Sequence, residues 1–241
     1  MSTYGPDDVG FILLGGYSLL GDSVEIRDKI EALTDDAHSL GDTWQEHAAV
    51  GLMRSEVSQK GYFNDTTNAI HTALNGNQGI SSVFSYGVEG NTLGKKFIGY
   101  NGALVVDYER IASLDKLHRI SVTYRGNGQV DEGLILHVLG AETSDGDSEG
   151  SPTSVDNGGS SADGGVGFLH VVAYSGFTDV VFKIRDSSDD STYADLITFS
   201  TVTGIGAERA TVAGTVDQYL AVSWDVTGSG SVTFMVGFKR N

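Results

Sequence analysis

The sequence contains no cysteine and only 2 prolines among its 241 residues. Without thiols it has no disulfide framework, no thiolate nucleophile, no Cys-bound zinc and no iron–sulfur cluster. Cationic residues are also scarce, because 15 Lys and Arg stand against 32 Asp and Glu and leave a formal charge of -17. A general nucleic-acid-binding protein needs clustered Lys and Arg to neutralise phosphates. The composition therefore argues against that class.

The acidic residues are spread along the chain rather than collected in one tail. Such a surface keeps a protein soluble at the cost of self-repulsion, and proteins from salt-rich habitats use it. Two interpretations stay open, namely adaptation to high salt and an ordinary acidic protein.

Long hydrophobic runs are missing as well. A membrane-spanning helix needs about 20 apolar residues in succession, whereas the longest run near the start, Val9 to Leu14, is interrupted by Gly10. The first residues, MSTYGPDDVG, lack the basic region of a secretory signal. We expect no secretory signal and no membrane insertion.

Motifs for catalysis and cofactor binding give no signal. We identify no nucleophile elbow, no phosphate-binding P-loop and no G-x-G-x-x-G between a strand and a helix. We therefore expect no catalytic residue, no cofactor-binding residue, no cofactor and no metal ligand. The six histidines lack the spacing that places two imidazoles on one metal; they are His38, His47, His71, His118, His137 and His170.

One segment approaches the pattern of a calcium loop. Residues 145–156 begin Asp-Gly-Asp-Ser-Glu-Gly, close to the EF-hand sequence. However, Glu149 occupies the fifth position, Asp156 replaces the closing glutamate, and Pro152 interrupts the loop. No amphipathic helix is predicted on either side. We expect a solvated acidic loop, with adventitious calcium binding as the alternative.

Short runs of alternating apolar and polar residues, separated by Gly, Asp and Ser, dominate the sequence. This pattern is typical of half-buried antiparallel strands. Turns are expected at 186–190, 203–206 and 227–230, with a hairpin turn at Gly126-Asn-Gly128. The pattern predicts a mainly β protein with an antiparallel β-sandwich. The predicted strands are 9–14, 52–63, 80–88, 96–108, 117–124, 133–139, 168–174, 179–185, 194–199, 208–212, 218–225 and 231–239.

One short helix is predicted over residues 65–74. Asn64 or Asp65 would cap its start, apolar residues follow at helical spacing, and Asn75-Gly76 would end it. Residues 26–33 are ambiguous between helix and strand, since their charged and apolar residues fit a helix face while the flanking Gly-Asp pairs suit an extended segment.

Residues 143–167 hold many Gly, Ser and Asp and almost no apolar residue. This composition is typical of a linker or a long exposed loop. It either separates two domains or is an insertion between strands of one sandwich. We accordingly divide the chain into a β domain at 1–142, an acidic loop or linker at 143–167, and a β-sheet or sandwich at 168–241.

Two groups of segments resemble one protein family. Residues 16–22 (GYSLLGD), 35–44 (DDAHSLGDTW) and 51–65 (GLMRSEVSQKGYFND) resemble the N-terminal half of major tail, or tail tube, proteins of long-tailed viruses of bacteria and archaea. In that family a loop ending in Leu-Gly-Asp-Thr/Ser-Trp/Phe precedes a strand ending in Gly-Phe/Tyr-Phe/Tyr-Asp. A sheet common in the same group is similar to residues 181–196 (VFKIRDSSDDSTYADL), 213–222 (AGTVDQYLAV) and 233–240 (TFMVGFKR).

The resemblance implies a structural virion protein that is made in the host cytoplasm and located in the tail. Its subunits would form rings, with inner strands closing a barrel across subunits, and stacked rings would conduct viral DNA without binding it specifically. Hexameric rings are favoured, and trimeric pseudo-sixfold rings of a duplicated fold are the alternative. Its partners would be itself and other tail proteins. Residues 15–49 would be a loop that orders against a neighbouring subunit, and the lumen would be acidic.

Two other functions stay open. A carbohydrate-binding or receptor-binding β-sandwich would expose an aromatic platform. A capsid decoration or head–tail connector protein would share the virion setting and the β-rich structure. The candidate platform residues are Tyr62, Phe63, Tyr86, Tyr100 and Tyr108.

Overall fold

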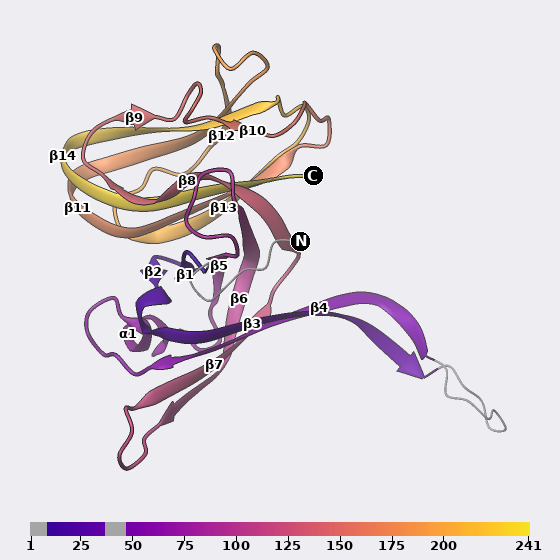
Figure 1. Ribbon diagram of the computed structural model, residues 1–241, viewed down its shortest axis with the longest axis vertical. Helices are drawn as coiled ribbons and strands as arrows, with labels where there is room; N and C mark the ends of the chain where they lie inside the picture. The colour runs from indigo at the N-terminus through magenta and orange to yellow at the C-terminus, as the bar shows by residue number, and fades with distance from the viewer. Residues whose placement is uncertain (1–8, 37–46) are drawn as a thin grey trace.

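The computed structural model describes residues 9–36 and 47–241. These residues form an antiparallel β structure with one short α-helix (Figure 1), so the prediction of a mainly β fold is confirmed. No helix among them is long and apolar enough to span a membrane. The elements are β1 (Ile12–Leu14), β2 (Tyr17–Ser18), the 3-10 helix η2 (Leu20–Asp22), β3 (Ser23–Asp36), β4 (His47–Tyr62), α1 (Ile70–Leu74), β5 (Ser81–Gly87), β6 (Lys96–Ile111), β7 (Arg119–Gly126), β8 (Val130–Glu142), β9 (Gly146–Asp147), β10 (Val155–Asp156), β11 (Gly165–Ser187), β12 (Ala194–Thr198), β13 (Gly206–Val212) and β14 (Tyr219–Arg240).

The C-terminal part is built on one long ladder between β11 and β14, which pair over almost their whole lengths. The ladder bends near its middle, where the register shifts around Phe177 and where Gly176 and Gly228 have φ of +82° and +96°. Bulges of this kind bend a strand and keep it in its sheet. The two halves of the bent ladder, with β8, β12 and β13 beside them, enclose one apolar core (Figure 1). We call this unit the C-terminal sandwich.

The bend explains one wrong prediction. From the sequence, β11 is predicted as two strands, 168–174 and 179–185, and β14 as two strands, 218–225 and 231–239, with a turn at 227–230. Each pair is a single strand. Glycine-rich stretches that look like turns in the sequence are bulges here, because both strands remain paired through them.

The N-terminal part has the strand order β3-β4-β7-β6-β5-β1-β2, and β8, which pairs with both β14 and β6, connects it to the C-terminal sandwich in one continuous sheet. Its inner side packs against α1, and the shared core includes Val57, Phe84, Tyr100 and Tyr124. β7 and β8 both pair with β6 and follow each other along it. The predicted hairpin turn at 126–128 is therefore wrong, since this segment is an irregularity along β6 and the Asn127 N–H donates to the Gly102 carbonyl over 2.7 Å.

The predicted helix is present but shorter than expected. α1 begins at Ile70, after Ala69, and has no side-chain cap. Asn64 does not cap it, because the Asn64 side-chain oxygen accepts from the Thr66 N–H instead. The predicted end is confirmed, since the helix stops before Asn75 and Gly76 follows with φ of +94°.

A third core lies between the N-terminal part and the C-terminal sandwich. It includes Phe11 and Phe97 from the N-terminal part and Phe168 and Met235 from the C-terminal sandwich, all fully buried. The Phe97 and Phe168 rings meet edge to face, with centroids 5.5 Å apart. A Cβ on Gly99 would lie 2.7 Å from the Phe168 ring, so glycine is required where this ring crosses β6.

Residues 143–167 lie along the C-terminal sandwich. Their short strands β9 and β10 both pair with β14. Ser148 and Val155 are buried, and Ser148 Oγ accepts from the Val222 N–H over 2.9 Å. The segment connects β8 to β11, and both of these strands pair with β14. The division of the chain at residues 142 and 167 stays a prediction.

Candidate assembly surface

The strands β3, β4, β7 and β6 form a four-stranded sheet with two open edges. Among the described strands, β3 pairs with β4 alone. At the other edge, the pairing of β6 with β5 ends at Leu104, and the last backbone bond on that side joins the Gly79 N–H to the Val105 carbonyl. Beyond it, residues 106–111 pair with β7 alone among the strands that the structure describes. An open strand edge is a template for pairing with another chain.

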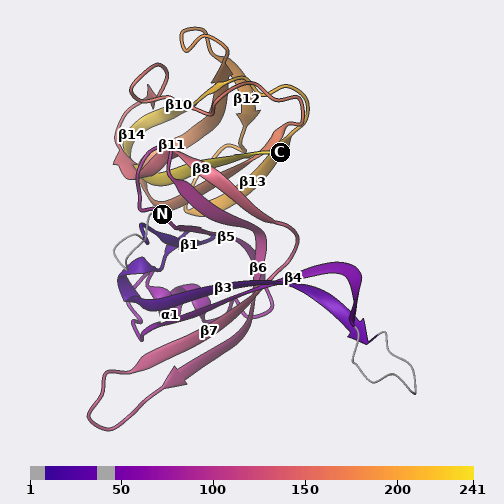
Figure 2. The same ribbon diagram turned by 45° about the vertical axis from the view of Figure 1, so that its right-hand side comes forward.

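The strands β3 and β4 continue beyond the sheet as a two-stranded arm. Pairing of β4 with β7 ends at Glu56, whereas pairing of β4 with β3 continues to His47. The arm projects far from the rest of the chain (Figures 1 and 2). Residues 26–33, ambiguous from the sequence, are strand. The prediction that residues 15–49 form a loop is wrong for the described residues, which include β2, η2 and β3. The quoted motif at 40–44 lies outside the described residues.

Large apolar side chains are exposed mainly on this four-stranded sheet and its extensions. On the arm, Leu52 and Met53 are 64% and 69% exposed. At the connection between β6 and β7, Leu114 is 91% exposed. Of the large exposed apolar residues in the described chain, Ile205 alone belongs to the C-terminal sandwich. Exposed apolar groups gathered on one part of a molecule mark an interaction site.

Side-chain hydrogen bonds fasten the base of the arm to the sheet. The hydroxyls of Tyr86 and Tyr100 donate to the two carboxylate oxygens of Asp28, at 2.9 and 2.5 Å. Burial, followed by the nearby Asp28 carboxylate, raises the pKa of both hydroxyls, so they remain protonated donors. Deeper in the sheet, the Tyr124 hydroxyl donates to Gln59 over 2.7 Å. β3 and β4 are therefore held to the sheet at their base by specific bonds.

These bonds also bear on the predicted aromatic platform. Tyr86 and Tyr100 are buried in the core, and Tyr108 shares a 2.7 Å hydrogen bond with His71. Phe63 also packs against the His71 ring. Only Tyr62, 38% exposed, faces solvent beside Arg119. The five candidate residues do not form one exposed platform.

The carboxylates of the proposed calcium loop already have partners within the protein. Asp145 accepts from the Val226 N–H over 2.7 Å, and Asp156 accepts from the Gly158 N–H over 2.8 Å. Glu149 pairs with Arg185. Within residues 9–36 and 47–241, no group of three or more His, Asp or Glu is placed to hold a metal ion.

The expectation that the sequence contains no G-x-S-x-G spacing is wrong as a statement about the sequence. Residues 146–150 read Gly-Asp-Ser-Glu-Gly, which has the letters of a nucleophile elbow. That motif needs a strand, a sharp turn and a helix, with the serine exposed. Here Ser148 is buried, its hydroxyl is bonded to the Val222 backbone, and turns follow it rather than a helix.

Two histidines serve as buried packing groups. The His170 ring lies between the Gly15 carbonyl, 2.9 Å from Nδ1, and the Ser85 hydroxyl, 3.0 Å from Nε2. The His137 ring stacks on Phe234 with centroids 4.1 Å apart. Burial lowers the pKa of both histidines to about 4. His38 lies outside the described residues.

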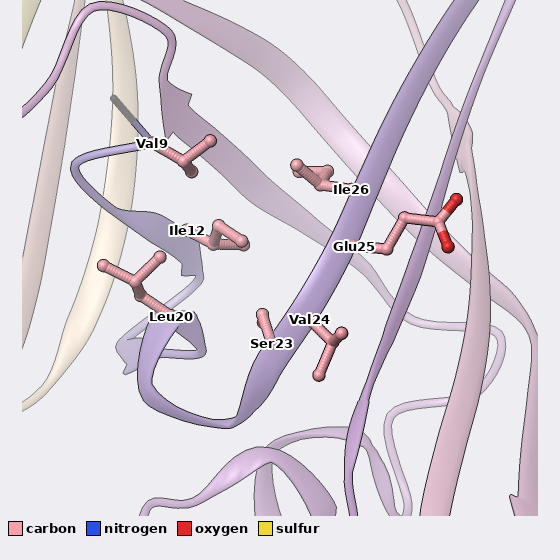
Figure 3. Close-up of a pocket in the computed structure, with 7 residues that line it drawn as sticks. All are labelled: Val9, Ile12, Leu20, Ser23, Val24, Glu25 and Ile26. Carbon is pink, nitrogen blue, oxygen red and sulfur yellow. The ribbon is translucent and has the colours of Figure 1, made fainter. Parts of the chain in front are cut away.

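A cavity of about 290 Å³ lies where β1, η2 and the start of β3 meet. Its walls are mostly apolar, and Figure 3 shows the Glu25 carboxylate pointing away from Ile12 and Leu20. Glu25 has the one titratable side chain among the described residues that line it. The lining residues are Val9, Ile12, Leu20, Ser23, Val24, Glu25 and Ile26.

Comparison with known proteins gives distant structural likeness only. No protein-family model matches the sequence, and no curated protein matches it. The chain is similar to a protein in the tail of an empty gene transfer agent particle with C6 symmetry, with 14% identity, a TM-score of 0.39, and coverage of 53% of this chain and 97% of that one. A chain of the native gene transfer agent virion gives 14% identity and a TM-score of 0.37 over 54% of this chain and 98% of that one. The Dit protein of phage SPP1, described as a hub adsorption apparatus, gives 13% identity and a TM-score of 0.36 over 95% of this chain and 98% of that one. These TM-scores are low, so the likeness assigns the chain to no family.

Proposed function

We propose that this protein is a structural subunit of a viral tail, and that it assembles into rings in which the four-stranded sheets of neighbouring copies form one continuous barrel. The observation that carries the proposal is the pair of open edges. β3, β4, β7 and β6 alternate in direction, so β3 and β6 run in opposite directions. The open part of β6 in one copy therefore meets β3 of the next as an antiparallel pair.

Head-to-tail pairing of this kind makes rings when the rotation closes. Closure also removes both open edges of the four-stranded sheet, which a strand-rich protein must otherwise protect. We favour six copies per ring over trimeric pseudo-sixfold rings, because the described chain supplies one sheet with two open edges rather than two. The sequence resemblance to major tail proteins supports the same role. Stacked rings would form a conduit for viral DNA, with other tail proteins at its ends.

The arm is assigned to contacts between copies. It extends beyond its own sheet and exposes Leu52 and Met53, whose apolar surface would be buried against a neighbouring subunit or ring. Burying such side chains contributes about 1.5–3 kcal/mol each. This contribution is repeated at every subunit, so a small change per copy has a large effect on a tube.

Negative-stain electron microscopy of the purified protein, at high and low salt, tests the proposal. We expect rings or hollow tubes for the wild type and dispersed particles for Leu52→Asp/Met53→Asp. The matched control is Ile205→Asp, which changes an exposed apolar residue on the C-terminal sandwich and is expected to assemble. Circular dichroism of each variant establishes that the fold is intact.

Dispersed monomers of the wild type under every condition would contradict the proposal. They would favour a binding or decoration protein, and a glycan array and the copy number in purified particles would then separate these two. Single rings that never stack would indicate a terminal ring of a tail rather than its tube.

A further inference from the structure

The outer face of the four-stranded sheet carries a regular pattern of opposite charges. Charged residues occupy alternate positions of β3, namely Glu25, Arg27, Lys29 and Glu31, which lie on one side of a strand. Every pair of charged residues that lie directly opposite each other on this face has opposite signs. These pairs are Glu25 with Lys60, Lys29 with Glu56, and Glu31 with Arg54 between β3 and β4, and Glu56 with Arg125 between β4 and β7.

Ion pairs join these side chains into local groups. Glu31 pairs with both Lys29 and Arg54, and Glu25 pairs with Arg27 and, over 3.3 Å, with Lys60. The four cationic side chains of these pairs are each more than half exposed, so no other part of the chain covers this face. The pKa of Glu25 is lowered chiefly by its bond with Lys60, and that of Glu31 by its bond with Lys29. Both carboxylates therefore stay charged near neutral pH.

The pattern coincides with an uneven distribution of charge along the chain. Residues 23–36, 47–62 and 96–126, which form the sheet and its hairpin, hold nine cationic and nine anionic residues. The remaining six cationic and 23 anionic residues carry the whole net charge of -17. The sheet is thus neutral, while the negative charge lies mainly on the C-terminal sandwich.

We infer that this face lines the conduit and acts as a charge-balanced, low-adhesion surface toward the DNA that passes it. The inference rests on the proposed function and gives the lining a specific chemistry. Neighbouring strands lie about 4.7–4.9 Å apart. The electric fields of opposite charges on neighbouring strands therefore cancel at distances from the sheet greater than roughly one strand spacing. That distance is shorter than the Debye length of about 8 Å at physiological salt, so a phosphate at a distance meets little net field. The cations of β3 and β4 on this face, and Arg125 of β7, each have an anionic neighbour, so DNA gains little by displacing counterions there. The prediction of an acidic lumen does not describe this face.

Binding of labelled duplex DNA, measured by fluorescence anisotropy on dispersed protein at low salt, tests the balance of charges. The variant Glu25→Gln/Glu31→Gln/Glu56→Gln frees cations on the face. The control Asp163→Asn/Asp179→Asn/Asp225→Asn makes the same change in net charge on the C-terminal sandwich. We expect DNA binding by the face variant alone, weakening with salt at a log–log slope of roughly -4.5 for the five freed cations Arg27, Lys29, Arg54, Lys60 and Arg125. Binding by the wild type, equal binding by both variants, or no binding by the face variant would overturn the inference.

The position of the face is tested separately in assembled tubes, using the absence of cysteine in the natural sequence. Thr123→Cys places a thiol on the outer face of β7, beside Ser58 of β4. Asp163→Cys places a thiol on the C-terminal sandwich. A large maleimide–polyethylene glycol reagent should label both variants when dispersed, and only Asp163→Cys in tubes. Equal labelling in tubes would overturn the inference while leaving the proposed function intact. Failure to form any ring or tube would instead refute the proposed function, and the DNA experiment would still test the charge balance.

Discussion

Replacing Phe168 and Gly99 with alanine, singly and together, tests the third core. The Phe168 ring is fully buried, meets Phe97 edge to face, and covers Gly99. Phe168→Ala removes the ring and leaves a cavity, which costs about 3–5 kcal/mol of unfolding free energy. Gly99→Ala places a methyl group 2.7 Å from the ring, which costs about 1–3 kcal/mol through overpacking.

The double variant gives the sharper result. Once the ring is gone, the methyl group added by Gly99→Ala enters the vacated space and no longer clashes. The double variant should therefore be more stable than the sum of the two single changes predicts, by about 1–3 kcal/mol.

Chemical denaturation of dispersed protein, followed by circular dichroism, measures these values. Gly204→Ala is the control, because a Cβ there meets no atom within 4 Å and should change stability by less than about 0.5 kcal/mol. Strict additivity in the double variant, or no cost for Gly99→Ala alone, would refute the packing argument.

Three further predictions concern charge, a buried bond and pH. Assembled tubes should be stabilised by salt, because the self-repulsion of many copies of charge -17 is screened within ~3 Å at about 1 M; tubes that survive dialysis into low salt unchanged, in electron micrographs, would contradict this. Tyr124→Phe removes the donor to Gln59 and should cost about 1–2 kcal/mol in denaturant titrations, and a cost near zero would show that the bond contributes nothing. The pKa of His170 falls to about 4 in the folded state from 6.5, so the unfolded state binds its proton first and stability decreases as pH falls from about 6.5 toward 4. This amounts to roughly 2 kcal/mol by pH 5, and His170→Gln should have a flatter pH profile; an unchanged profile would exclude the effect.

Much of the strand content was predictable, because alternating side chains reveal strands that are buried on one side. In β7, Ile120, Val122 and Tyr124 are buried while the residues between them are not, and this period is visible in the sequence. The end of β14 shows the limit of this pattern, because residues 234–238 are all buried and Met235 belongs to the third core. The β fold and its single helix therefore follow from local pattern.

Other features depended on contacts that the sequence does not display. The charges of β3 have a period of two, yet Ile26 and Ile30 also fit a helix face, so the local pattern did not decide between them. The bends at Gly176 and Gly228 resembled turns because only the partner strand distinguishes a bulge from a turn. The residues of the assembly surface were not predicted together, because β4 and β6 are far apart in sequence and lie in one sheet only through β7, which pairs with both.

The third core also has a consequence for synthesis. It places Phe11, near the start of the chain, against residues of β11 and β14, which include Met235 near the end. Domains generally fold as units as the chain emerges from the ribosome, N-terminal parts first. Here the N-terminal sheet cannot complete its packing until β14 has left the ribosome. A nascent chain therefore lacks the finished support for its open edges, and pairing between copies is delayed until β14 has been synthesised and has packed.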